Sequence, residues 1–190
     1  MKKALVGCGG HAREVMVQMG TALTCFVDDE FLTEGCLPLS SFNPDDYVVM
    51  IAIANSPDRF NVANKLPKET KYFTFIHPTV LIMGDVEIGE GSFIGANSIL
   101  TTNIKIGSHS LLNRGNHIGH DCMIGNFFSA MPGAIVSGNV NIGNSVYLGT
   151  NSSIREKINI TDNVTIGLNT GIVKSIDKSG TYVGQNNRLI

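Results

Sequence analysis

From residue 80 to residue 175 the chain repeats one pattern of apolar and polar positions every six residues. The third position of all sixteen six-residue blocks is apolar: Ile82, Ile88, Ile94, Leu100, Ile106, Leu112, Ile118, Ile124, Ala130, Val136, Ile142, Leu148, Ile154, Ile160, Ile166 and Ile172. No residue is inserted or deleted along this series. A period of six is neither helical nor heptad, and it is typical of a β-helix in which each block forms a short strand and a turn.

Glycine occupies the fourth position in eight of these blocks. We expect the apolar residue before it to point inward, and we expect the glycine to ease the turn by adopting a positive φ. Burying one aliphatic side chain contributes roughly 1.5–3 kcal/mol, while ordering each backbone residue costs about 1–2 kcal/mol. Ladder hydrogen bonds and contacts between chains must therefore help, and the outward-facing positions are the natural place for oligomer contacts.

The first 76 residues follow a different pattern, in which strands alternate with helices. We predict strands at 3–6, 23–29, 47–55 and 71–76, and helices within 7–20 and 56–66. The second helix has Ser56 as its expected N-cap and Pro57 at its first position. The alternation predicts a small parallel α/β sheet. We therefore expect two domains, at residues 1–76 and 77–190.

Composition and charge exclude several classes of protein. The formal net charge is −2 and only 16% of residues are charged, so no basic face for nucleic acid is expected. No apolar run is long enough to span a bilayer. The start, MKKALVGC, is similar to an export signal, but its apolar run is too short. The four cysteines form no C-x-x-C pair and indicate reduced thiols in a cytosolic protein.

The stretch GCGGHA, at residues 7–12, fits the G-x-G-x-x-A phosphate-binding turn between a strand and a helix. Asp28 and Asp29 follow at the end of the second predicted strand, where an acidic residue meets a ribose or a base. An NAD-dependent enzyme is one reading, but a full dinucleotide fold needs two such halves. One half suits a nucleoside diphosphate. The glycine turn can also be explained by tight packing alone. The two aspartates can also be explained by the preference of aspartate for turns.

Histidines are the candidate proton-transfer groups. His120 and Asp121 lie side by side in a predicted turn of the hexad region, and His117 is expected to point outward. A histidine titrates near neutral pH and suits the role of a general base, and a neighbouring carboxylate can hold its tautomer and stabilise the imidazolium. A solvated turn histidine beside an acid is the alternative. His117 and His120 supply only two ligands where catalytic zinc usually has three, so we predict no metal.

The order of the motifs GCGGHAREV, FVDD, IAIAN, IHPTV and then the hexads resembles the sugar-acyltransferase family. This family includes N-acetyltransferases of nucleotide-linked amino sugars and O-acetyltransferases of sialic acid. The resemblance covers nearly the whole chain. It implies an α/β plus β fold, with a small Rossmann-like domain followed by a left-handed parallel β-helix that has three hexads per triangular coil.

The same resemblance implies roles for individual residues. Gly9, Gly10 and His11 would face a diphosphate, Asp28 and Asp29 would face the base or ribose, and Asn55 would line the same site. His120 and Asp121 match a His-acid pair of the family.

Acetyl-CoA would lie in the cleft between neighbouring β-helices, with the backbones of Gly149 and Gly167 as approach points. Family members often carry a second histidine near the acyl carbonyl. Here the region reads NFFSAMPG, and Ser129 is the nearest polar candidate.

We therefore predict a cytosolic homotrimer that transfers acetyl from acetyl-CoA to the amine of a UDP-, GDP- or dTDP-linked amino sugar. His120 would be the general base and Asp121 its orienting partner. The alternatives are an O-acetyltransferase of sialic acid or another sugar and, in a different class, an NAD-dependent enzyme or a binding scaffold. The sequence does not specify the nucleobase or the sugar.

Overall fold

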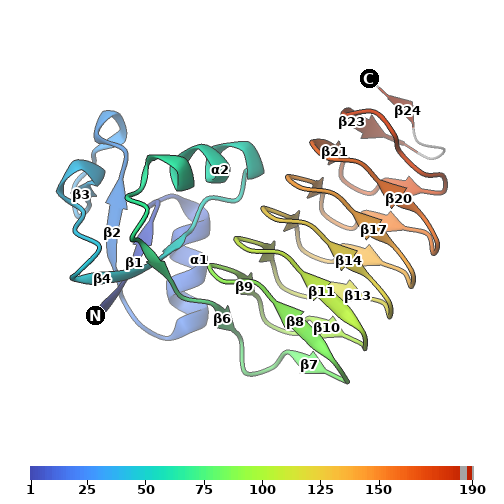
Figure 1. The fold of residues 1–190 in the computed structure, drawn as a ribbon, viewed down its shortest axis with the longest axis horizontal. Helices are drawn as coiled ribbons and strands as arrows, with labels where there is room; N and C mark the ends of the chain where they lie inside the picture. The colour runs from blue at the N-terminus through green and yellow to red at the C-terminus, as the bar shows by residue number, and fades with distance from the viewer. Residues whose placement is uncertain (185–187, 190) are drawn as a thin grey trace.

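The computed structural model describes residues 1–184 and 188–189. A small α/β sheet lies beside a long β-helix, and the coils of the β-helix stack from β6 toward the C-terminus (Figure 1). No disulfide is formed by the four cysteines, which are all free.

The small domain is a five-stranded parallel sheet in the order β3-β2-β1-β4-β5. Its strands are β1 (Lys2–Val6), β2 (Thr24–Val27), β3 (Leu37–Pro38), β4 (Tyr47–Ile51) and β5 (Lys71–Tyr72). The helices are α1 (Gly10–Met19) and α2 (Ser56–Lys65), with short 3₁₀ turns η1 (Asp29–Phe31) and η2 (Leu39–Ser41). One face of the sheet packs with α1 and the β-helix, and the other packs with α2.

Both helices have identifiable ends. The helix α1 stops at Gly20, whose φ of 67° places it in the left-handed region that glycine tolerates. The predicted cap of α2 is wrong by one residue. Asn55 is the N-cap, because its side-chain oxygen accepts a hydrogen bond of 3.0 Å from the backbone N–H of Asp58.

The strand predicted at 71–76 is in fact two strands in two different sheets. Residues 71–72 form β5, which pairs with β4 in the small domain. Residues 75–76 form β6 (Phe75–Ile76), which pairs with β9 in the β-helix. The chain thus leaves one sheet and enters the other within two residues. Residues 72 to 76 all favour strands, so their sequence does not show that the chain changes sheets here.

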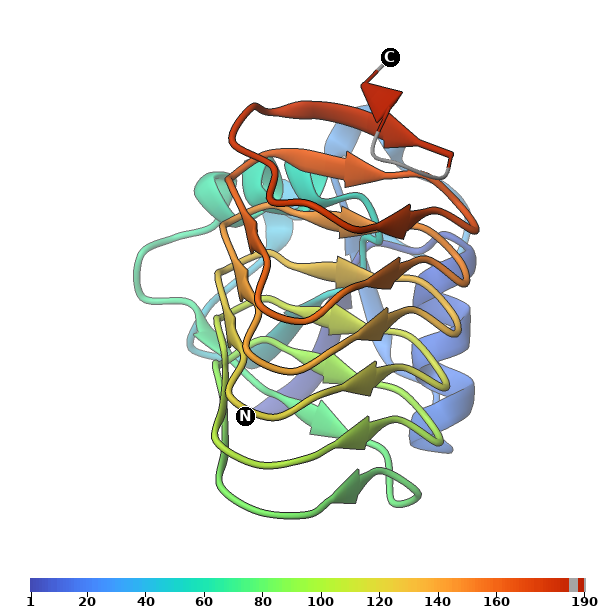
Figure 2. The ribbon, with the colours of Figure 1, turned by 90° about the vertical axis from the view of Figure 1, so that its right-hand side faces the viewer.

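Three sheets make up the β-helix, and Figure 2 shows their strands stacked coil upon coil. The docking sheet, against which the small domain packs, comprises β6, β9 (Phe93–Ile94), β12 (Leu111–Leu112), β15 (Ser129–Ala130), β18 (Tyr147–Leu148), β21 (Val164–Ile166), β23 (Gly180–Val183) and β24 (Arg188–Leu189).

The second sheet comprises β7 (Leu81–Ile82), β10 (Ile99–Leu100), β13 (His117–Ile118), β16 (Ile135–Val136), β19 (Ser153–Ile154) and β22 (Gly171–Ile172). The third sheet comprises β8 (Val86–Ile88), β11 (Ile104–Ile106), β14 (Met123–Ile124), β17 (Asn141–Ile142) and β20 (Asn159–Ile160). Parallel partners are eighteen residues apart, as in the pair Leu100–Ile118. Three six-residue blocks therefore complete one coil.

The interior stack is the predicted one. The third-position side chains from Ile94 to Ile172 are almost fully buried and belong to one apolar cluster. Ile82, in the first coil, is 41% exposed because no coil covers it on one side. The period of the sequence therefore fixes the register of every later coil.

The predicted role of the fourth-position glycines is wrong. Positive φ occurs instead at the sixth position of every block from residue 91 to residue 169: Gly91, Asn97, Asn103, His109, Gly115, Asp121, Phe127, Gly133, Asn139, Ser145, Asn151, Lys157, Asn163 and Asn169. At the fourth position a side chain would strike the next coil. A Cβ on Gly107, for example, would lie 2.6 Å from the backbone nitrogen of Asn126. These glycines therefore permit close packing of coils.

Candidate functional site

A cavity of about 740 Å³ opens where the carboxyl ends of β1, β2 and β4 meet. Gly9, Gly10 and His11 line it from the glycine turn, Asp28 from the end of β2, and Asn55 from the start of α2. The carboxyl edge of a parallel sheet is the usual ligand site of such folds. The structure thus brings five of the six predicted nucleotide-site residues to one cavity.

Asp29, the sixth, does not line the cavity. Its carboxylate accepts a 3.0 Å hydrogen bond from the backbone N–H of Ser40. Hydrogen bonding by the side chain of Ser40, and then by its backbone, lowers the pKa of Asp29. Asp28 instead faces the cavity and forms an ion pair with Lys65 from the end of α2. The two neighbouring aspartates therefore have different environments.

His11 lies at the junction between the domains as well as in the cavity wall. Its ring packs edge-on against Phe93 of the docking sheet, with 5.5 Å between centroids. Burial lowers the pKa of His11, although Glu14, 3.6 Å from Nδ1, opposes the shift. A neutral imidazole here can donate one hydrogen bond but carries no charge for a diphosphate.

Glu14 is held in turn by the β-helix. Arg114 donates to it at 3.1 Å and Asn113 at 3.3 Å. Partial burial favours the protonated acid, but these two hydrogen bonds and the charge of Arg114 hold the pKa of Glu14 below its ordinary value. This junction could not be predicted from the sequence, because its partners are about a hundred residues apart.

His120 and Asp121 do meet. Nδ1 of His120 lies 2.6 Å from Oδ2 of Asp121, and both side chains are about half exposed. The other carboxylate oxygen accepts a 2.6 Å hydrogen bond from Nδ2 of Asn103, one coil earlier. The hydrogen bonds from Asn103 and His120 lower the pKa of Asp121. An ionised carboxylate that holds Nδ1 leaves Nε2 free to accept a proton.

These two residues occupy the turn between the second and third sheets, named here the His corner (residues 101–103, 119–121 and 137–139). The small domain covers the docking sheet and the two corners that flank it. His109 and Phe127 contact α2 at one of these corners, and Arg114 contacts α1 at the other. The His corner is the third. A single chain therefore does not bring the imidazole–carboxylate pair to the cavity of its own small domain.

Ser129 does not offer its side chain to a ligand. It is fully buried between the domains, and its hydroxyl is bonded to Ala54 O and Ser56 Oγ at 2.8 and 3.0 Å. Arg59 also donates to it, at 2.8 Å. The predicted contact with acetyl-CoA is therefore wrong for this side chain, which belongs to the domain interface.

Gly149 and Gly167 lie at the corner between the docking and second sheets, not at the His corner. Both backbone N–H groups are used in the ladder, with acceptors Ile166 O and Tyr182 O at 2.8 Å. A Cβ on Gly149 would lie 2.5 Å from Leu168 N, and one on Gly167 would lie 2.8 Å from Val183 Cγ1. Close packing by itself explains both glycines.

His109 is buried, although it lies in a turn at the sixth position of its block. Its ring stacks on Phe127 with 5.0 Å between centroids and meets Tyr72 edge-on at 4.4 Å. Burial, aided by the positive charge of Arg59, lowers its pKa to about 4. His109 is therefore neutral at physiological pH and belongs to the domain interface.

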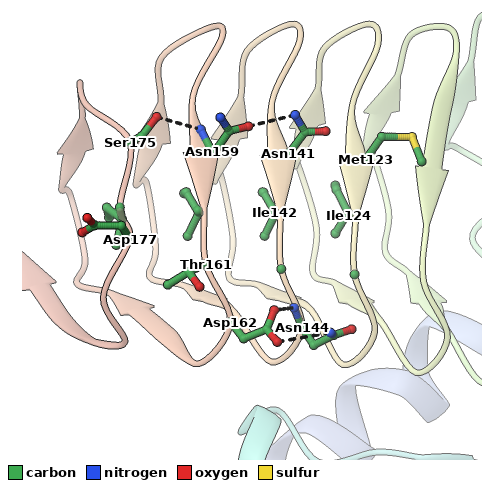
Figure 3. A pocket seen from close by; sticks show the side chains of 14 residues that line it. Met123, Ile124, Asn141, Ile142, Asn144, Asn159, Thr161, Asp162, Ser175 and Asp177 are labelled. Atoms are coloured by element: carbon green, nitrogen blue, oxygen red, sulfur yellow. Dashed lines mark hydrogen bonds between the residues drawn. The ribbon is translucent and has the colours of Figure 1, made fainter.

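A second cavity, of about 790 Å³, runs over the third sheet (Figure 3). Its outer wall carries a ladder of amides in which Asn141 donates to Asn159 at 2.9 Å. Met123, two residues after Asp121, begins the cavity. The outward positions of this sheet therefore carry polar side chains on the strands that follow the His corner.

Within residues 1–184 and 188–189, no group of three or more His, Cys, Asp or Glu side chains is arranged to hold a metal ion. In the same part of the chain, no helix is long and apolar enough to cross a membrane.

The repeats and the three-sheet coil define the class of protein. Residues 73–102 match the bacterial transferase hexapeptide repeat. This chain has the fold of hexapeptide-repeat sugar acyltransferases, and the resemblance seen in the sequence is confirmed by this match and by the solved structures that follow. No curated protein sequence matches the chain significantly.

Several solved structures resemble the whole chain. WeeI from Acinetobacter baumannii is 29% identical with a TM-score of 0.88, and the alignment covers 100% of both chains. The acetyltransferase domain of PglB from Neisseria gonorrhoeae is 24% identical with a TM-score of 0.86, over 100% of this chain and 99% of the other. PerB from Caulobacter crescentus, solved with CoA and GDP-perosamine, is 20% identical with a TM-score of 0.87, over 100% and 97%. The two lower identities establish a shared fold.

Proposed function

We propose that this protein is an acetyltransferase that moves an acetyl group from acetyl-CoA to the amine of a nucleotide-linked amino sugar. The imidazole–carboxylate pair of His120 and Asp121, 2.6 Å apart on an exposed corner, is the observation that carries this proposal. The fold supports it, because PerB was solved with CoA and GDP-perosamine and the PglB domain with acetyl coenzyme A.

In the proposed reaction the amine nitrogen attacks the thioester carbon. Nε2 of His120 takes the proton that the nitrogen loses, and the carbon–sulfur bond breaks to release CoA as its thiol once a proton is returned to sulfur. Asp121 fixes the tautomer in which Nδ1 carries hydrogen, and it stabilises the imidazolium. No covalent acyl-enzyme is needed.

The small domain supplies the nucleotide site in this proposal. Its strand order and its glycine turn support a Rossmann-like role, with the diphosphate near Gly9 and Gly10 at the N-terminus of α1. Asp28 and Asn55 line the same cavity and would face the ribose or the base. The proposed division at residues 76–77 thus separates nucleotide binding from acyl transfer.

We include a homotrimer in the proposal, because the His corner faces away from the small domain of its own chain. A neighbouring copy would place its nucleotide cavity, and its corner with Gly149 and Gly167, against His120. Acetyl-CoA would then lie between adjacent β-helices. The cytoplasm, where acetyl-CoA is made and thiols stay reduced, is the proposed location.

Thiol release from acetyl-CoA tests the function directly. The purified protein should release CoA thiol only when the right sugar is present, in a panel of UDP-, GDP- and dTDP-linked amino sugars and their hydroxyl analogues. Turnover of the hydroxyl sugars, with no calorimetric binding of any nucleoside diphosphate, would instead indicate sialic acid-type O-acetylation. Absence of any acyl-CoA affinity would contradict acyl transfer altogether.

A further inference from the structure

Both coils adjacent to His120 contribute a residue to its surroundings, one from below and one from above. Asn103, one coil earlier, donates to Oδ1 of Asp121 at 2.6 Å. Gly138, one coil later, has no side chain, and a Cβ there would lie 2.6 Å from Nε2 of His120 and 2.7 Å from Cε1. The imidazole of His120 therefore lies against the backbone of Gly138 on one side. On the other side, its carboxylate partner Asp121 is held by a hydrogen bond from Asn103.

We propose that Asn103 and Gly138 are positioning residues for the proton transfer at His120. This inference rests on the proposed function, since it assumes that His120 is the base. Asn103 acts through Asp121, and Gly138 acts by leaving room for the ring.

Asn103 limits how the carboxylate can turn. Asp121 has two oxygens, and each is used: Oδ1 accepts from Asn103 and Oδ2 meets His120 Nδ1. Without the amide, the half-exposed carboxylate can rotate toward water and release the ring. A fixed carboxylate holds the tautomer that leaves Nε2 as the acceptor, and a mobile one does not.

Gly138 limits where the ring can go. A methyl group at this position would contact the edge of the imidazole that carries Nε2, at less than van der Waals distance. The ring would have to turn out of the plane that faces Asp121. The φ of Gly138 lies outside the left-handed region, so the backbone accepts alanine at this position. The three atoms nearest to the added methyl group all belong to His120.

Few charges face this pair. The adjacent coils present Asn103 and Gly138, both uncharged, and the same corner carries Asp85 two coils earlier and Glu156 and Lys157 two coils later. On the neighbouring strand Lys105 pairs with Glu87 at 3.1 Å. Within one chain, the charge nearest to His120 is therefore that of Asp121.

Two variants and two matched controls test the proposal in the full-length protein. Asn103→Gly removes the amide but keeps a residue that accepts φ near 53°, and Asn163→Gly makes the same change at another sixth position, φ 57°. Gly138→Ala adds the blocking methyl group. Gly171→Ala adds one where the nearest atom, Ser153 Oγ, is 3.8 Å away.

Thiol release, pH–rate profiles and thermal unfolding are measured for all four variants and for His120→Ala. Asn103→Gly and Gly138→Ala should each lower kcat roughly 3- to 10-fold, with KM values and melting temperatures close to those of the controls. The pH–rate profile of Asn103→Gly should differ from that of Asn163→Gly, because Asn103 fixes the carboxylate beside the proposed base.

The outcomes separate this inference from the proposed function. If His120→Ala retains full activity, the base is elsewhere and both proposals fail. If His120→Ala is inactive while Asn103→Gly and Gly138→Ala keep the kcat and pH profile of their controls, the positioning role alone is overturned.

Discussion

Nη2 of Arg59, on α2, donates a 2.8 Å hydrogen bond to the hydroxyl of Ser129 in the docking sheet. Arg59 is 1% exposed, and all its acceptors are uncharged: His109 O, Ile53 O, Ala54 O, Phe127 O, Phe128 O and Ser129 Oγ. Burial lowers its pKa only to about 9, so the guanidinium stays charged at neutral pH. One side chain thus joins the wall of the cavity in the small domain to the β-helix.

Arg59→Lys should destabilise the protein by about 3 kcal/mol. A lysine keeps the charge but cannot reach acceptors on both domains with one nitrogen, so buried carbonyls lose their donors. Urea unfolding of the variant, with Arg155→Lys as control, measures the effect. Arg155 forms an exposed pair with Glu156, and its substitution should change stability by less than about 0.5 kcal/mol. Equal stability of the two variants would contradict the interface role.

Acid should lower the free energy of unfolding, because His109 is buried as the neutral imidazole. Its folded pKa of about 4 lies below the ordinary 6.5, so the unfolded chain binds the proton first. The stabilisation is complete above pH 6.5 and is lost as pH falls toward 4, to a total of about 3 kcal/mol. Unfolding free energies at intervals between pH 4 and 8 measure this slope.

His109→Asn is the test of that slope, because asparagine accepts the positive φ of this position and does not titrate. The variant should be less stable at pH 8, through lost ring contacts, but should lose less stability on acidification. Some slope should remain because the pKa of His11 is also lowered by burial. An unchanged slope would show that His109 does not carry it.

Gly149→Ala should destabilise the protein by about 1–3 kcal/mol through overpacking, because the new methyl group would meet Leu168 N at 2.5 Å. Gly171→Ala, with no close neighbour, should stay within about 0.5 kcal/mol of the parent. Thermal unfolding compares the two. If Gly149→Ala instead kept its stability and raised only the KM for acetyl-CoA, its glycine would serve the substrate and not the coil.

The β-helix was almost wholly predictable from the sequence, because one aliphatic residue in six specifies both the coil length and the inward face. The handedness came from family resemblance and not from the period. The prediction that the fourth-position glycines adopt a positive φ was wrong. The sequence shows that these residues are small, but it does not show that the next coil lies too close for a side chain. Asn at many sixth positions was the available sign that positive φ belongs there.

The site was predictable in part. Adjacency of His120 and Asp121 suggested the pair, and the glycine turn suggested the cavity. The long-range contacts were not predictable: Asn103 with Asp121, Arg59 with Ser129 and Glu14 with Arg114 join residues 18, 70 and 100 positions apart. Ser129 was misassigned for this reason, since its burial depends on α2 and not on its own hexad.

His120→Ala should lower kcat roughly 10²- to 10⁴-fold, while thermal unfolding stays near that of the parent because the side chain is half exposed. Asp121→Asn should also lower kcat with an intact fold, since asparagine is common at this positive-φ position. Thiol-release kinetics measure both. Full activity of His120→Ala would refute the base assignment, and unfolding of Asp121→Asn would indicate a structural role.

Substitutions of the two aspartates after β2 should distinguish a residue that binds the nucleotide from one that stabilises the loop. Asp28 lines the cavity and pairs with Lys65, whereas Asp29 accepts from Ser40 N–H outside it. Asp28→Asn should weaken binding of the substrate's nucleoside diphosphate by roughly tenfold, as expected when one charged hydrogen-bond partner is lost.

Asp29→Asn is the matched control, and its affinity should stay within about twofold because the change falls outside the cavity. Isothermal titration of both variants with the same nucleotide gives the comparison. An equal loss of affinity would mean that the loop after β2 acts as a unit and that Asp28 does not contact the nucleotide by itself. A loss only for Asp29→Asn would place the base or ribose on the other side of η1, away from the cavity between β1 and α2.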